Sequence, residues 1–312
     1  MRIAMYRTEI RWRTALVAIV LLAAGAVMAQ DAVLRVANPF PLGMLDPHGS
    51  HALNIGTVTV ARHLFDTLVK WQDGELVPNL ATGWTNPDET TWTFSLRQDV
   101  TFHDGTPVTA HDVRASIERI VALAGPAAPL YQPITTIEVP SDHEIVLTTS
   151  APLGTMLVNL ARVFVAPAAS MNDEGFFQRP VGSGPFEFQS LALDDRAVLR
   201  ANRDYWGGAP HYDELVFVEI PEVSTRLTAL ATGEIDVTWL IPADQLESVR
   251  ATPGVQVRAH ASAMPVPPAA TRTGRPGRRW EQPPRRSPVQ PRRRSPIGLR
   301  GVGPSHDSGG EG

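Results

Sequence analysis

The 312-residue sequence contains no cysteine. Disulfides, thiolate metal sites, a cysteine nucleophile and a lipid anchor attached to cysteine are therefore not expected. Lysine is almost absent as well, since Lys70 stands alone beside 27 arginines, which we interpret as codon bias rather than function. No HExxH, Gly-x-Ser-x-Gly or glycine-rich phosphate motif occurs. The sequence thus predicts no catalytic residues and no cofactor, and Asp194-Asp195 is interpreted as a solvated turn.

Long apolar runs are missing beyond the N-terminal 29 residues. Four arginines open the chain, and residues 15–29 follow as an apolar run that ends in Val27-Met28-Ala29. A basic start, a short apolar core and small residues before the cleavage point are typical of a signal peptide, here residues 1–29. A membrane anchor is the alternative, although a bilayer span needs about 20 apolar residues.

Charge divides the remaining chain into two parts. Residues 30–261 carry 28 acidic and 14 basic side chains, whereas residues 262–312 carry ten arginines and three acids. An acidic body argues against nucleic acid as a partner. The tail is also rich in proline and glycine, so it cannot bury enough apolar area to fold, and we expect it to be disordered. Binding of this basic tail to anionic surfaces is one open hypothesis.

Between these ends, apolar periodicity predicts alternating strands and helices. Helices are expected over residues 57–68, from 109, over 156–165, over 225–232 and from 242. Strands are expected over residues 33–37, 92–96, 100–102, 136–139, 144–148, 185–191, 196–200, 215–220 and 235–241. Ser224 is the expected N-cap and Gly233 the expected C-terminal stop of the fourth helix.

Residues 92–113, WTFSLRQDVTFHDGTPVTAHDV, contain two His-Asp pairs. His103-Asp104-Gly105 fits a turn, because Asp and Gly accept turn geometry. Thr109 and Asp112 fit a capping box at a helix start. Metal binding through His48, His51, His103 and His111 is the alternative, since imidazole suits nickel and zinc. We favour the structural interpretation, which leaves no metal site.

These motifs together resemble the family 5 extracytoplasmic solute-binding proteins of ABC importers, the oligopeptide, dipeptide and nickel group. The resemblance is carried by LFDTLVKW from Leu64, GELVPNLATGW from Gly74, residues 92–113, VGSGPFEF from Val181, LRANRDYWGG from Leu199 and LTALATGEIDV from Leu227. It covers roughly residues 34–257 and then stops, while family members continue into a second lobe. A frameshift or truncated gene model is the favoured explanation, and a naturally short protein with a real tail is the other.

The resemblance implies an α/β, class II periplasmic-binding-protein-like fold, with the first lobe and insert domain present and the second lobe absent. The expected divisions are residues 30–69 for lobe I, 70–169 for the insert domain, 170–261 for the rest of lobe I and 262–312 for the tail. It implies a monomeric periplasmic protein that binds peptides or other small solutes, works with an ABC permease, and is impaired by loss of the second lobe. A secreted nickel- or other metal-binding protein, or a metallohydrolase, is the alternative.

By the same analogy, two loops are expected to face ligand and to offer backbone groups to an extended peptide. The ligand-binding residues predicted in this way are Leu42, Gly43, Met44, Asp46, Gly182, Ser183 and Gly184.

Overall fold

The computed structural model describes residues 32–258 and 269–272. The predicted signal peptide and most of the predicted disordered tail lie outside the described residues. Within them, no helix is long and apolar enough to cross a membrane.

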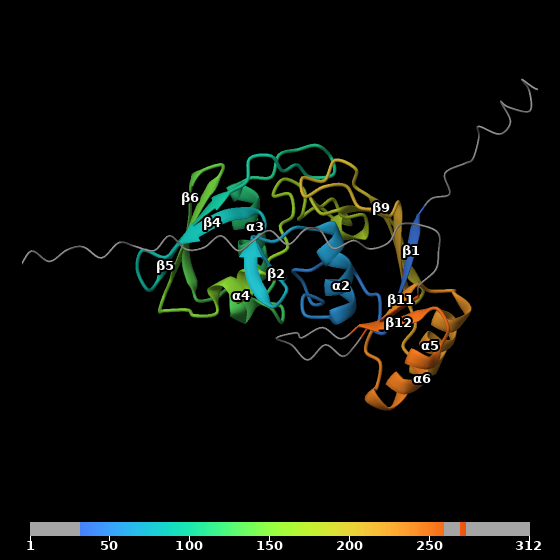
Figure 1. The fold of residues 1–312 in the computed structure, drawn as a ribbon. Coiled ribbons are helices and arrows are strands. Elements are labelled where there is room, and N and C mark those ends of the chain that lie inside the picture. Colours follow the sequence, from blue (N-terminus) through green and yellow to red (C-terminus); the bar gives the residue numbers. More distant parts are fainter. Residues whose placement is uncertain (1–31, 259–268, 273–312) are drawn as a thin grey trace, which may run out of the picture. The chain divides into compact units, whose positions relative to one another are not determined.

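A seven-stranded mixed sheet has the strand order β12-β13-β11-β1-β10-β9-β8. β1 runs parallel to both β10 and β11, whereas the remaining pairs are antiparallel. Figure 1 shows β1, β9 and β11 of this sheet. Its strands are β1 Val33–Asn38, β8 Phe186–Ala192, β9 Arg196–Ala201, β10 Glu214–Glu219, β11 Val237–Thr238, β12 Val255–Arg258 and β13 Ala269–Arg272.

Helix α2, Ile55–Leu64, covers one face of this sheet. Its buried residues Val60, Ala61 and Leu64 pack with Leu199 and Phe217 of the sheet. The helix predicted from the sequence extended to Leu68, and that prediction was wrong. Phe65 already has extended backbone angles, and Leu68 packs into a different apolar cluster.

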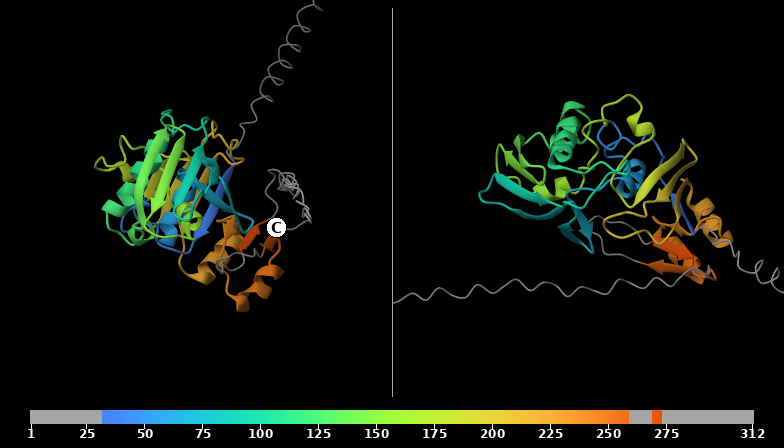
Figure 2. Two further views of the ribbon diagram at one scale, coloured as in Figure 1. Left: turned by 90° about the vertical axis from the view of Figure 1, so that its left-hand side faces the viewer. Right: turned by 90° about the horizontal axis from the view of Figure 1, so that it is seen from above.

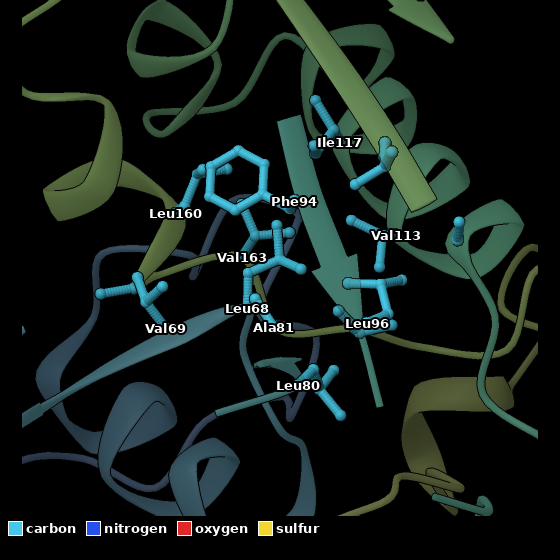
Figure 3. Close-up of a cluster of buried hydrophobic side chains, with 14 of the residues drawn as sticks. Leu68, Val69, Leu80, Ala81, Phe94, Leu96, Val113, Ile117, Leu160 and Val163 are labelled. Carbon is cyan, nitrogen blue, oxygen red and sulfur yellow. The ribbon is translucent and has the colours of Figure 1, made fainter. Parts of the chain in front are cut away.

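A four-stranded antiparallel sheet, in the order β4-β5-β7-β6, forms a second layer with helix α3 (Figure 2). Val113 and Ile117 of α3 point toward Phe94 and Leu96 of β5, and this contact closes the larger apolar cluster (Figure 3). The elements are β4 Ala81–Thr85, β5 Thr91–Leu96, β6 Ile134–Ser141, β7 Glu144–Thr149 and α3 Ala110–Ala122.

Shorter elements complete the described chain. α5 packs on β11 and β13, and α6 packs on β12. The remaining helices and strands are the hairpin β2 Val69–Gln72 and β3 Glu75–Pro78, the helices α4 Met156–Leu160, α5 Val223–Thr232 and α6 Leu246–Ala251, and the 3-10 turns Ala128–Leu130, Phe176–Gln178 and Ala243–Gln245.

Other predictions fail at element ends. Glu222, not Ser224, caps α5, because its carboxylate accepts a hydrogen bond from the Thr225 N–H at 2.7 Å. The helix expected over residues 156–165 spans only five residues, and the strand expected over 100–102 is a single bridge between Thr101 and Pro107. Strand β13 falls within the tail predicted to be disordered, so that prediction was wrong for residues 269–272.

Candidate functional site

Gly182, Ser183 and Gly184 lie against the C-terminal end of α2. The Gly184 N–H donates to the Leu64 carbonyl at 2.9 Å. A Cβ on Gly182 would stand 1.9 Å from that same oxygen, and one on Gly184 would meet the His63 carbonyl at 2.6 Å. Only glycine therefore allows this close approach. The predicted ligand loop is packed into the fold along this side.

Ser183 is buried and donates its hydroxyl to Asp66 at 3.1 Å. Three more neutral donors reach the same carboxylate: Asn79 Nδ2 at 3.1 Å, the Tyr205 hydroxyl at 3.0 Å and Trp206 Nε1 at 3.0 Å. Burial raises the pKa of Asp66, while the four hydrogen bonds oppose that rise. We call these five residues the Asp66 cluster.

The Asp66 cluster joins four of the sequence segments that carried the resemblance. Arg97 comes from a fifth of these segments, residues 92–113. It stacks on Trp206, with its guanidinium carbon 4.2 Å from the ring centroid. Ser183 was predicted from the sequence as a site residue, whereas Asp66 and its other partners were not. These residues lie in separate segments that carried the family resemblance, and this was the signal that the sequence offered. The sequence could not show that the segments meet in the folded chain.

Asp46 is held by α3 rather than presented to solvent. Both carboxylate oxygens accept hydrogen bonds from the Arg119 guanidinium group at 2.9 Å. One of them also accepts a hydrogen bond from the His48 N–H. Burial alone would raise the pKa of Asp46, but the hydrogen bonds and charge of Arg119, helped by the His48 N–H, lower it. This bidentate pair fastens the loop to the helix.

The four histidines considered as metal ligands have separate partners. His48 is fully buried with Nε2 2.7 Å from the Phe164 carbonyl oxygen, and burial lowers its pKa to about 4. His103 Nε2 lies 3.0 Å from the Gly184 carbonyl oxygen, His111 faces Asp142, and His51 Nδ1 lies 3.0 Å from the Ser50 hydroxyl. Over residues 32–258, no group of three or more metal-ligating side chains is close enough to hold an ion.

The accessible part of the predicted site lies at the start of α2. Met44 is 46% exposed, and its carbonyl accepts the Thr57 hydroxyl in the first turn of the helix. Leu53 and Ile55, on either side of the N-cap Asn54, are 42% and 49% exposed. We call Met44, Leu53 and Ile55 the α2 apolar surface.

Neighbouring backbone supports the α2 apolar surface. Gly43 lies beside the His51 ring, and a Cβ on Gly56 would stand 2.1 Å from the Pro41 carbonyl oxygen, so the loop rests on the helix start. Leu42 is buried with its N–H bound to Glu219. Of the seven predicted residues, Met44 has the clearly exposed side chain. Leu53 and Ile55 were missed, although both lie off the buried Val60–Leu64 stripe.

Comparison with known proteins gives the family. The family model described as "Bacterial extracellular solute-binding proteins, family 5 Middle" matches residues 75–274. The chain belongs to this family of solute-binding proteins, as the sequence motifs predicted.

Two curated relatives from Escherichia coli K12 are each 30% identical to the chain. One is the probable D,D-dipeptide-binding periplasmic protein DdpA, aligned over 82% of this chain and 53% of that protein. The other is the nickel-binding periplasmic protein, aligned over 68% of this chain and 42% of that protein. Both are named as binding proteins. The chain spans about half the length of these relatives.

Among solved structures, the binding protein AgaA from A. tumefaciens R10, in complex with agropinic acid, superposes with a TM-score of 0.65. It is 31% identical, and the match covers 72% of this chain and 47% of that one. The predicted periplasmic-binding-protein-like α/β fold is confirmed. The match covers about half of the AgaA chain.

Proposed function

We propose that this chain captures a solute for an ABC importer in the periplasm, with peptides as its cargo class and no chemical step. The family match over residues 75–274 is the observation that carries this proposal. Peptide cargo is favoured because DdpA, whose name describes a dipeptide binder, aligns over more of this chain than the nickel-binding relative does.

The α2 apolar surface is the proposed ligand contact within the described residues. Its three exposed side chains offer apolar area, and the Met44 carbonyl is bound to the Thr57 hydroxyl in the first turn of α2. Nearby acids are already engaged, since Asp46 pairs with Arg119 and Glu219 accepts the Leu42 N–H. Such a surface suits a ligand side chain that is apolar and uncharged.

We also propose that residues 30–69 and 170–261 belong to lobe I and that residues 70–169 form an insert domain. One apolar cluster draws mainly on residues 68–165 and the other on residues 36–65 and 164–217, which supports an insert domain between two parts of lobe I. In a two-lobe clamp, ligand shifts an equilibrium between open and closed forms. The part of such a clamp that residues 32–258 form should by itself bind ligand weakly.

Replacing Leu53 by Asp tests the proposed contact. The change places a charge on the α2 apolar surface without disturbing the core, because Leu53 is already exposed. We expect saturation-transfer NMR to show an affinity for apolar di- to pentapeptides reduced at least ~10-fold, which is a loss of about 1.4 kcal/mol. Leu193→Asp, at a 62% exposed leucine between β8 and β9, is the matched control.

Three results would contradict parts of this proposal. If Leu53→Asp and Leu193→Asp reduce peptide affinity equally, or if neither reduces it, the α2 apolar surface is not the ligand contact. Micromolar calorimetric affinity would contradict weak binding by one side of the clamp. Stoichiometric nickel uptake without peptide binding would replace peptide by metal as the cargo, in line with the nickel-binding relative.

A further inference from the structure

His103 attaches the turn at residues 102–106 to the loop at residues 182–184 through three hydrogen bonds. Its backbone N–H donates to the Gly182 carbonyl at 2.7 Å. The Gly182 N–H donates in return to Nδ1 of the imidazole at 3.2 Å, and Nε2 lies 3.0 Å from the Gly184 carbonyl oxygen. The loop is buried and the His103 ring is half-buried, so these bonds lie inside the fold.

These partners fit a single protonation state of the ring. A carbonyl oxygen only accepts, so Nε2 must carry the hydrogen that is donated to Gly184. A backbone N–H only donates, so Nδ1 must be free of hydrogen to accept from Gly182. The neutral Nε2–H tautomer satisfies both partners, whereas an imidazolium ion would place a second N–H against the Gly182 N–H.

Other hydrogen bonds hold each side of this contact in place. On the histidine side, the Asp104 carboxylate accepts the Thr106 N–H at 2.9 Å and the Thr106 hydroxyl at 2.6 Å, which fixes the turn. On the other side, the Gly184 N–H is bound to the Leu64 carbonyl at 2.9 Å. The two segments therefore cannot simply shift to make room for a second N–H.

Charged groups from three segments act on His103. They are Glu187 of β8, Asp66 just after α2 and Asp104 of the same turn. Glu187 is itself paired with Arg200. The three acids and the backbone hydrogen bond favour the imidazolium ion, but burial has the larger effect and lowers the pKa of His103. The ring therefore takes up its proton at a lower pH in the folded chain than in the unfolded chain.

We propose that His103 is an acid-sensitive latch, which holds residues 182–184 to the turn at residues 102–106 while neutral and releases them when Nδ1 is protonated. Because the ring is rigid, it cannot turn Nδ1 away from one glycine without drawing Nε2 away from the other. Phe102, its neighbour in sequence, lies in the larger apolar cluster, and Phe186, just after the loop, lies in the other. Acid should thus loosen the connection between these clusters before the whole chain unfolds.

Nuclear magnetic resonance on the full, isotope-labelled chain tests the latch. At about pH 7.5 the His103 ring should be the neutral Nε2–H tautomer. As the pH falls through the folded pKa, which lies below the unfolded value of 6.5, protonation of the ring should accelerate hydrogen exchange at Gly182. We expect the protection factor of the Gly182 amide to fall at least ~10-fold, as for the loss of one hydrogen bond. Ile117 and Ile120, which are buried in α3, report opening of the whole chain, and their protection should fall less.

His103→Asn separates the latch from other effects of acid. Asparagine offers an acceptor near the Nδ1 position and takes up no proton, so Gly182 protection should fall no more than that of Ile117 and Ile120. His111→Asn, at a side chain that is 60% exposed, is the matched control and should keep the original pH dependence at Gly182. An equally large fall in the His103 variant would assign the acid effect to other groups.

Two results on the unsubstituted chain would overturn the proposal, and neither depends on how the variants fold. One is a His103 ring that carries its hydrogen on Nδ1 at neutral pH. The other is a Gly182 amide whose protection follows that of Ile117 and Ile120 throughout the titration.

Discussion

Asp66 is a buried carboxylate held by neutral donors. Its four side-chain partners come from Asn79, Ser183, Tyr205 and Trp206, and none of these carries a positive charge. A buried ion without its hydrogen bonds would be strongly unfavourable, so each donor contributes more than it would at the surface. The cluster thereby ties the end of α2 to segments more than a hundred residues away.

Removing one donor should measure this contribution. Tyr205→Phe deletes the hydroxyl that donates to Asp66 at 3.0 Å and leaves the ring beside Trp206. We expect urea unfolding to show a loss of about 1.5–3 kcal/mol, the usual range for a hydrogen bond to a charged group. Tyr212→Phe, at a half-buried tyrosine outside the cluster, should change stability little. Equal effects of the two substitutions would contradict the special role of the Asp66 cluster.

At the scale of elements, local rules predicted most of what the structure shows. The Thr109–Asp112 box is confirmed, since the Asp112 carboxylate accepts the Thr109 N–H at 2.8 Å. The same side chain also accepts the Ala168 N–H, a tertiary contact that no local pattern reveals. Packing against distant segments also determines where α2 begins and ends and which side chains at its start stay exposed. The sequence pattern therefore did not predict the ends of α2 or the α2 apolar surface.

Strand β13 shows where composition misled the prediction. Its residues lie in a segment rich in proline and arginine, yet β13 stands between β11 and β12 and pairs with both. Backbone hydrogen bonds supply that pairing and depend little on side-chain type. A low-complexity segment can therefore complete a sheet when two unpaired strand edges accept it.

Proline at position 270 should break this strand. Ala270 pairs with Thr238 on one side and Val257 on the other, and proline removes the N–H that an interior strand needs. We expect Ala270→Pro to accelerate hydrogen exchange at Thr238 and Val257 and to lower stability by about 1–3 kcal/mol. Ala270→Ser keeps the N–H and is the control. Unchanged exchange in the proline variant would show that β13 contributes nothing to the sheet.

For the whole molecule, buried titratable groups determine how stability depends on pH. His48, His63 and His103 all have a pKa lowered first by burial, so the folded chain binds fewer protons than the unfolded chain in mildly acidic solution. Asp46 also has a lowered pKa and acts in the same direction at lower pH, whereas the raised pKa of Asp66 acts against it.

His48 should contribute clearly to this balance, because its pKa falls from 6.5 to about 4 in the folded chain. Its contribution is fully present above the unfolded value of 6.5 and is lost as the pH falls toward 4, by about 3 kcal/mol in total. Urea unfolding between about pH 7 and pH 4.5 should therefore show falling stability. His48→Gln should flatten that fall, because glutamine can still donate to the Phe164 carbonyl and takes up no proton. His111→Gln, at a side chain that is 60% exposed, is the control and should leave the dependence of stability on pH unchanged. If stability falls just as steeply in the His48→Gln variant, other groups cause the acid sensitivity.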